Sequence, residues 1–190
     1  IYNRITDTFE LIRNGYIKDL RCFKNELFFI MTDKLVKLSE EQKFTEFSIS
    51  KINSFEVTDE GIWYNAGNNG LQMLNSSTQY FHNRVINLIK EIDNNLWIAF
   101  RNGDLFRIDS SENISKIHTM NRHNVMDIEQ INGKIFLATD GNGILLLDED
   151  GTLIGHWKKE QNKSSKIPSN SIYNISKGLN GTIWISTYGA

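Results

Sequence analysis

The chain has 190 residues, of which 39% are hydrophobic and 11% aromatic, and its formal net charge is −2. This size and apolar content allow a substantial core, whereas the small net charge excludes a broad electrostatic attraction to nucleic acid or to an anionic membrane surface. No apolar run is long enough to span a membrane, and the single cysteine excludes an internal disulfide. We expect Cys22 to be a buried or half-buried strand residue, because apolar and polar residues alternate around it.

One pattern recurs along the chain. It consists of a short alternating strand, a tight turn, an apolar run centred on an aromatic residue, and a second turn rich in Gly or Asn. The central aromatic residues follow one another at intervals of about 35–50 residues, which is typical of propellers and solenoids. They are Phe28, Trp63, Trp97, Phe136 and Trp184. Each lies within a predicted buried strand, so we interpret all five as structural core residues rather than as platforms for sugar stacking.

In chain order, the pattern gives a leading segment, four repeats and a final half-repeat. Their ranges are 1–14, 15–50, 51–83, 84–120, 121–168 and 169–190. We predict that together they form a single β-propeller domain or a propeller fragment.

The repeat at 121–157 shows the predicted strands most clearly. An alternating strand containing Val125, Ile128 and Ile131 leads into the Asn-Gly-Lys turn at 132–134, which suits a type I′ hairpin. The continuous apolar run 135–139 indicates a strand that is buried on both faces. Two further turns separate two more strands, and no helical period is visible. Four antiparallel strands with two buried faces are typical of one propeller blade. We therefore predict an all-β fold, a β-propeller of four-stranded antiparallel blades.

The two ends of the chain are complementary in phase. Residues 1–14 align with the third and fourth strands of a repeat, so that Tyr2, Ile5 and Ile12 match Leu71, Leu74 and Phe81. The C-terminal half-repeat supplies only a first and a second strand. The chain therefore carries about five blades' worth of strands, which predicts either a closed five-bladed ring or an arc of a larger propeller.

The segment 167–190 resembles the two-component regulator propeller repeat. The residues that carry the resemblance are Pro168, Ser169, Asn170, Gly181, Trp184, Thr187 and Gly189. The repeats at 85–109 and 124–151 match it in outline, although Phe136 stands in place of the motif's Trp, and Ala99 and Ala138 in place of its Gly.

The resemblance implies a function in signalling. It points to the periplasmic sensor region of a Bacteroidetes-type hybrid two-component histidine kinase, which is anchored in the inner membrane and often senses carbohydrate breakdown products. It also implies that the partners are a small-molecule or oligosaccharide ligand, the other domains of the same receptor, and a second copy in a homodimeric receptor. The histidine kinase domain would lie elsewhere in such a protein.

No catalytic constellation is visible in the sequence. The four histidines, at 82, 118, 123 and 156, lack short metal-ligand spacing, and the Asp- and Gly-rich segments at 140–143 and 148–151 are interpreted as hairpin turns rather than calcium loops. We expect no metal, no cofactor and no enzymatic turnover by this chain.

The strand topology predicts a recognition face. In an up-and-down blade, the loop after the second strand and the segment before the first strand lie at the same edge of the sheet. This edge gathers amides, guanidinium groups and one aromatic ring, which suit sugar hydroxyls. The candidate ligand-binding residues are Asn68, Arg84, Arg101, Asn102, His123, Asp140, Asn142 and Tyr188.

Three functions remain open from the sequence. The first is a ligand-sensing propeller that signals by binding. The second is a protein-interaction scaffold that docks another sensor domain or subunit. The third is a propeller glycosidase or lyase, which needs a convergent pair of acids or a metal centre.

Overall fold

The computed structural model describes residues 2–3, 8–9, 15–32, 34–49, 51–159 and 167–189, the first two ranges as backbone only. Within these ranges the fold is all-β, and the one helical element is a short 3-10 turn, η1 (Leu179–Gly181). The chain divides into two compact units, Ile1–Ile52 and Asn53–Ala190. Each unit is described by itself below.

The first unit contains two antiparallel sheets in its described residues. β1 (Tyr2–Asn3) pairs with β2 (Thr8–Phe9), in the segment where two strands are predicted, while Ile5 and Ile12 lie outside the described residues. The second sheet has the order β3 (Ile17–Phe23), β4 (Glu26–Met31), β5 (Lys34–Leu38) and β6 (Phe44–Phe47).

Two single-residue predictions fall in this second sheet. Phe28 is buried on β4. The prediction for Cys22 is wrong, because this residue is exposed on β3. β3 is an edge strand of its sheet, and alternate side chains along an edge strand readily face water.

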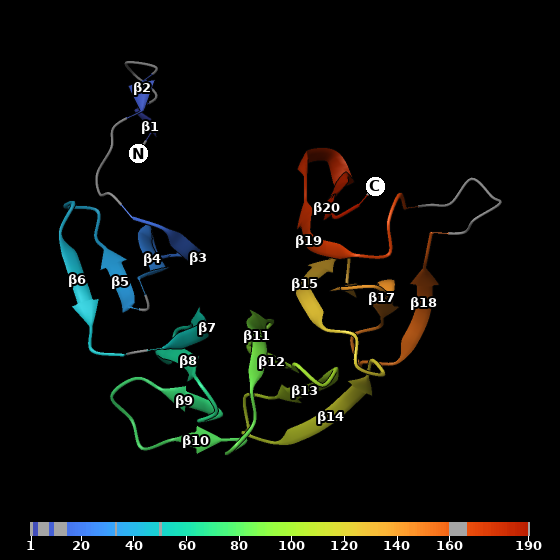
Figure 1. Cartoon of the computed structure of the whole chain (residues 1–190), viewed down its shortest axis with the longest axis horizontal. Helices are drawn as coiled ribbons and strands as arrows, with labels where there is room; N and C mark the ends of the chain where they lie inside the picture. The colour runs from blue at the N-terminus through green and yellow to red at the C-terminus, as the bar shows by residue number, and fades with distance from the viewer. Residues whose placement is uncertain are drawn as a thin grey trace. The chain divides into compact units, whose positions relative to one another are not determined.

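The second unit contains three four-stranded sheets and one two-stranded sheet in its described residues, and in each of them the strands follow one another in chain order (Figure 1). The first sheet has β7 (Ile52–Val57), which starts at the unit boundary, β8 (Ile62–Ala66), β9 (Leu71–Met73) and β10 (Gln79–Tyr80). The second has β11 (Ile86–Ile92), β12 (Asn95–Phe100), β13 (Asp104–Ile108) and β14 (Ile114–Thr119). The third has β15 (Val125–Ile131), β16 (Lys134–Thr139), β17 (Gly143–Leu147) and β18 (Leu153–Trp157). The last pairs β19 (Ile172–Lys177) with β20 (Ile183–Thr187).

Tight hairpin turns explain why these strands pair in chain order. Asn132 and Gly133, between β15 and β16, both have positive φ, at 53° and 72°. Positive φ at both central residues defines the type I′ turn, so the predicted hairpin is confirmed. Asp93 and Asn94 make the corresponding turn between β11 and β12, with φ of 49° and 59°. The twist of such a turn matches that of the strands that it joins.

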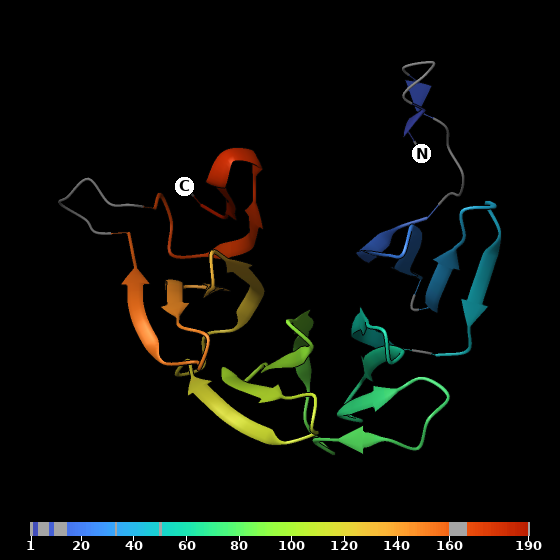
Figure 2. The ribbon, with the colours of Figure 1, turned by 180° about the vertical axis from the view of Figure 1, so that it is seen from behind.

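Apolar clusters join successive sheets of the second unit, which lie next to one another along the green-to-red part of the chain in Figure 2. Trp63 and Leu71 pack with Ile86, Ile98 and Phe100 of the following sheet. The next cluster joins β11–β13 to β15–β17, and the third joins β15–β17 to β19. The middle strands are consequently buried on both faces, as the continuous apolar runs predict.

One register repeats from sheet to sheet and fixes the place of the central aromatic residues. Trp97 on β12 pairs with Lys90, Phe136 on β16 with Glu129, and Trp184 on β20 with Ser176. In each case the register shifts by one residue near the start of the first strand, at a β-bulge. These aromatic residues therefore hold equivalent positions.

The predicted burial of Trp184 is wrong. Trp97 is 2% exposed, whereas Trp184 is 67% exposed. Ile183 and Ile185 point from β20 toward the cluster with β15–β17, so Trp184, which alternates with them, lies on the other face of the strand. None of the described residues of the second unit builds a further sheet against that face.

Polar side chains of one sheet accept hydrogen bonds from main-chain N–H groups on the first strand of the next sheet. The Ile175 N–H on β19 donates to Asp127 Oδ2 of the preceding sheet at 3.0 Å, and the Ile89 N–H on β11 donates to Ser54 Oγ at 3.1 Å. Asp127 also accepts from its own neighbour Ile128, and from Asn174 at 2.8 Å. Edge N–H groups that would otherwise be buried without an acceptor are thereby satisfied.

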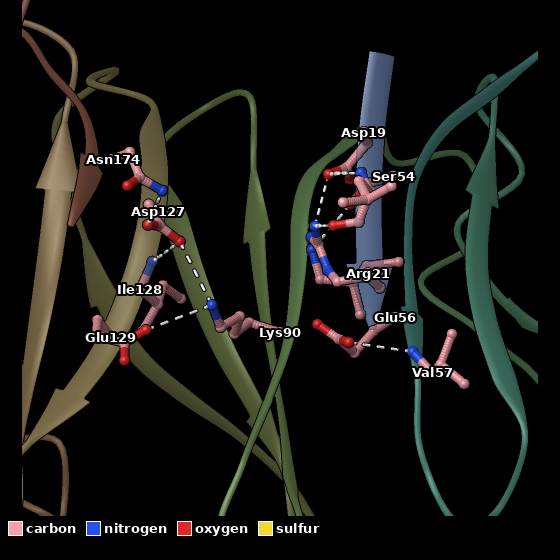
Figure 3. Close-up of polar contacts among 12 residues, drawn as sticks. Asp19, Arg21, Ser54, Glu56, Val57, Lys90, Asp127, Ile128, Glu129 and Asn174 are labelled. Atoms are coloured by element: carbon pink, nitrogen blue, oxygen red, sulfur yellow. Dashed lines mark hydrogen bonds and ion pairs between the residues drawn. The ribbon is translucent and has the colours of Figure 1, made fainter. Parts of the chain in front are cut away.

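A lysine strengthens this network. Figure 3 shows Lys90 of β11 reaching across to β15, where its Nζ lies 3.8 Å from Asp127 Oδ1 and 3.5 Å from Glu129 Oε2. Because Asp127 is buried, the nearby ammonium group offsets part of the cost of desolvating its carboxylate.

Candidate functional site

Backbone hydrogen bonds place the predicted recognition loops at one edge in three sheets of the second unit. The Arg101 N–H donates to Val85 O at 3.2 Å, the Asp140 N–H to Asn124 O at 3.0 Å, and the Tyr188 N–H to Ser171 O at 3.0 Å. In each sheet the end of the second strand thus lies beside the residues that precede the first strand.

The same edge continues from one sheet to the next. The Met120 N–H donates to Gly103 O at 2.8 Å, and the N–H groups of Gly141 and Gly143 both donate to Asn170 O. Gly103 has φ of 85°, and a Cβ there would lie 3.1 Å from the Arg122 nitrogen. This crowding requires glycine at the position and keeps the loops close together.

Three of the predicted residues line one depression at this edge. Arg84, Arg101 and Asn102 surround a volume of about 310 Å³ together with Asn83, Val85 and Phe100. The Arg84 guanidinium lies 3.6 Å from the centre of the Phe100 ring, a cation–π contact that holds it in place. Arg101 is exposed at the rim.

Asp104, which is not among the predicted site residues, holds this group of side chains together. Its carboxylate accepts from Arg84 at 2.7 Å, Lys116 at 2.8 Å, Asn102 at 3.0 Å and Thr119 at 2.9 Å. Burial raises the pKa of Asp104, but the hydrogen bonds from these donors outweigh burial and lower the pKa well below its usual range. The carboxylate is therefore charged at neutral pH and orients Arg84.

His123, Asp140 and Asn142 lie one sheet further along the chain. His123 Nδ1 is 3.0 Å from Asp140 O, and His156 Nε2 is 2.6 Å from Asn142 O. These contacts use main-chain carbonyl groups, so they leave the Asp140 carboxylate and the Asn142 amide out of the histidine contacts.

The two remaining candidates lie at separate places on the edge. Asn68 is exposed in the turn between β8 and β9, which Gly67 and Gly70 form with positive φ. Tyr188 is 73% exposed after β20, and its ring centre lies 6.3 Å from that of Tyr173. Neither residue lines the depression at Arg84.

Two further features of the described residues bear on function. No group of three or more His, Cys, Asp or Glu side chains among them could hold a metal ion. Their helical content also includes no segment long and apolar enough to cross a membrane.

The side chains that sequence reasoning missed are chiefly carboxylates with several donors around them. Asp104 follows a Gly turn and reads as an ordinary turn residue, so no sequence signal marks it. Asp127 stands inside an apolar strand pattern, and a charged residue in that setting is itself a signal of a buried polar contact.

No protein-family model matches the sequence, and no curated protein matches it either. Solved structures do match the fold, at identities that carry information about the fold alone.

The first similar structure is the extracellular domain of a protein assigned as a hybrid two-component system, BT4673, from B. thetaiotaomicron. It matches with a TM-score of 0.72 at 20% identity over 90% of this chain and 26% of that one. A second such domain, BT3049 from the same organism, matches with a TM-score of 0.61 at 16% identity over 99% of this chain and 34% of the other. The chain thus spans about a quarter to a third of these domains.

A third match is the WD40 β-propeller domain of Doa1, with a TM-score of 0.58 at 10% identity over 92% of this chain and 66% of that one. The sheets and these matches define the class of fold: the chain is built from antiparallel β-propeller blades, four of which have all four strands within the described residues. The particular structures that it resembles include extracellular domains of proteins assigned as hybrid two-component systems, the group that the motif at 167–190 also resembles.

Proposed function

We propose that the chain is a ligand-sensing part of an extracytoplasmic two-component receptor, and that it recognises a carbohydrate-derived ligand by binding without turnover. The observation that carries the sensing role is the likeness in fold to extracellular domains of proteins assigned as hybrid two-component systems. A periplasmic location, an inner-membrane anchor and a histidine kinase domain elsewhere in the receptor belong to the same proposal.

The loop edge around Arg84 is the proposed binding site. Its depression combines a fixed guanidinium, an exposed second guanidinium on Arg101 and the Asn102 amide. Guanidinium and amide groups donate in fixed geometry to hydroxyl and carboxylate oxygens, the groups that oligosaccharides offer. Loops on a rigid sheet scaffold are also the usual carriers of recognition. Contacts would extend to Asn68, His123, Asp140, Asn142 and Tyr188.

A thermal-shift screen of the 190-residue chain against neutral and acidic oligosaccharides tests this proposal. A ligand at about 100 times its Kd stabilises the folded state by roughly 2.7 kcal/mol, which raises the Tm by roughly 5–10 °C for a chain of this length. The ligand found should then be titrated by calorimetry into Arg101→Ala, Tyr188→Ala and the control Lys134→Ala. Lys134 lies at the opposite end of its strand from Asp140.

We expect Arg101→Ala to weaken binding about tenfold or more, the usual cost of a charge-assisted hydrogen bond, and Lys134→Ala to bind normally. Unchanged affinity in both Arg101→Ala and Tyr188→Ala, with their folds intact, would remove this edge as the site. Chemical conversion of the bound oligosaccharide would contradict binding without turnover.

One observation favours a protein-interaction role as the second candidate. Large apolar side chains are exposed together in the segment that carries β19 and β20; they are Tyr173, Leu179, Trp184 and Tyr188. Such a surface suits another domain of the same receptor or a second copy. In that case Trp184→Ser would change the oligomeric state in light scattering and leave oligosaccharide affinity unaltered.

A further inference from the structure

A second pocket lies at the opposite edge of the second unit, between the β7–β10 sheet and the β11–β14 sheet. It encloses about 230 Å³, and its wall includes the aromatic rings of Trp63 and Tyr80, whose centres lie 6.1 Å apart. The turn between β7 and β8 and the turn between β13 and β14 form its rim. The depression at Arg84, by contrast, lies at the turns that follow the second strands.

The charge of this pocket is one-sided. Five carboxylates line it, and none of the described residues in its wall is basic; the acids are Asp59, Glu60, Glu91, Asp109 and Glu112. Desolvation by burial and the nearby charges of Glu56, Asp59 and Glu60 raise the pKa of Glu91. Three of the acids are engaged by neighbours: Glu112 accepts from the Tyr80 hydroxyl at 2.9 Å, Asp109 accepts from its own turn, and Asp59 also has an interaction within the protein. Glu60 and Glu91 are the remaining candidates for an external partner.

The indole of Trp63 supplies an independent observation. Trp63 is only 5% exposed, and its Nε1–H is buried without a hydrogen-bond partner among the described residues. A buried donor without an acceptor costs roughly 1–3 kcal/mol. The side chain forms part of the pocket wall, and because the nitrogen itself is closed to solvent, an acceptor on a bound molecule would reach the donor with a small shift of the indole.

The next junction along the chain also has a depression, of about 230 Å³, but there the charged groups are paired within the protein. Between the β11–β14 and β15–β18 sheets, the guanidinium of Arg107 lies 5.8 Å from the centre of the Trp97 ring and donates to Glu149 O at 3.1 Å. Beside it, the Gln130 amide donates to the Asp93 carboxylate. At this junction a guanidinium of the protein itself therefore lies against the tryptophan ring, and a neutral amide, not a second carboxylate, lies beside Asp93.

The pocket at Trp63 differs from the next junction at two positions that determine its charge. Met73 pairs with Trp63 as Arg107 pairs with Trp97, so a neutral thioether stands where the next junction has a guanidinium. Glu91 stands where the next junction has Gln130, since both precede the last residue of their strand. One positive charge is thus absent and one negative charge is added.

We propose that the pocket at Trp63 binds a small organic cation, whose ammonium or guanidinium group lies over the indole ring as Arg107 lies over Trp97. Glu60 and Glu91 provide the opposite charge, and Trp63 Nε1 donates to an acceptor atom of the ligand. A cation against a tryptophan face gains about 0.5–2 kcal/mol, most where water is excluded. This site is separate from the oligosaccharide site proposed above, and either can exist without the other.

Agmatine is the probe for this site, because it carries both a guanidinium and an ammonium group. Titrated into the 190-residue chain by calorimetry at low salt, it should bind one site with a Kd of about 1 mM or lower, while the neutral diol 1,4-butanediol should not bind. Glu91→Gln, which installs the residue of the next junction, should weaken binding about tenfold or more. Met73→Arg should abolish binding, because the new guanidinium takes the place of the ligand.

The control is Glu149→Gln, which removes one negative charge outside the pocket and should leave agmatine affinity unchanged. Three results would overturn the proposal: no saturable binding by the parent chain, equal loss of affinity in Glu149→Gln and Glu91→Gln, or tighter binding of Ca²⁺ than of agmatine at the same site. If Met73→Arg fails to fold, as judged by circular dichroism, the comparison of Glu91→Gln with Glu149→Gln decides alone.

Discussion

Replacing Trp97 and Trp184 separately with alanine compares one side chain at one register position in two surroundings. Both residues lie in the second strand of their sheets and pair with the equivalent residue of the first strand. They differ in burial, since Trp97 is 2% exposed and Trp184 is 67% exposed. The pair therefore isolates what packing by a following sheet contributes to stability.

The expected magnitudes follow from the buried area. A large aromatic side chain buries roughly 150–250 Å², which at about 25 cal/mol per Å² corresponds to roughly 4–6 kcal/mol as an upper limit. Measured costs of deleting such a residue are about 3–5 kcal/mol, and we expect this loss for Trp97→Ala. Trp184 buries about a third of its surface and would leave no closed cavity, so we expect a loss of about 1 kcal/mol.

Urea unfolding followed by far-ultraviolet circular dichroism measures both free energies of unfolding without relying on tryptophan fluorescence. Equal slopes with urea concentration would show that the variants unfold to similar states. A loss below about 1 kcal/mol for Trp97→Ala, or equal losses in the two variants, would refute the argument that packing between sheets stabilises this fold.

Two buried or half-buried carboxylates, those of Asp104 and Asp127, should also contribute measurably to stability. Asp104→Asn should cost about 1–3 kcal/mol at neutral pH, because it removes the charged acceptor of Arg84 and Lys116. Because the pKa of Asp104 is lowered, its contribution to the free energy of unfolding is present above the usual aspartate pKa of about 3.9 and is lost as the pH falls through the pKa of the folded state. The urea midpoints of the parent chain and of Asp104→Asn should therefore converge as the pH is lowered. A difference between the two midpoints that stays constant with pH would contradict this. Asp127→Ala should cost about 2–4 kcal/mol of stability, since it leaves two N–H groups without an acceptor. Asp127→Asn keeps a carbonyl oxygen and should cost less. A larger loss of stability in Asp127→Asn than in Asp127→Ala, measured by thermal unfolding, would rule out the acceptor role.

Periodicity explains why the strands and their aromatic residues could be predicted from the sequence. A strand buried on both faces must be apolar along its whole length, so Trp97 and Phe136 stand out within their runs. The exposure of Trp184 could not be predicted in this way. Its run has the same pattern, but burial depends on which sheet packs against the strand, and a local pattern holds no information about a neighbour.

Only part of the candidate site could likewise be predicted from the sequence. Topology alone was enough to expect Arg84, Arg101 and Asn102 at one edge, because strand direction fixes the end at which each loop lies. The role of Asp104 depends on donors that come from β14 as well as from the adjoining loops. Which side chains converge from different strands depends on the register of strand pairing. The sequence pattern did not specify that register closely enough.

The repeated register also makes the chain its own control for interpreting function. Positions that hold the same place in successive sheets share their backbone surroundings, so a difference between them reflects the local role of the side chain and not the demands of the fold. Arg107 and Met73 are such a pair, and so are Gln130 and Glu91. At one junction the two residues pair with groups of the protein itself, whereas at the other they leave an acidic pocket beside an unsatisfied indole. Packing alone gives no reason to prefer the second arrangement, because it leaves one buried donor without an acceptor and brings like charges close to Glu91. An arrangement that costs stability at one junction, and is avoided at the next, is expected where a ligand supplies the missing charge.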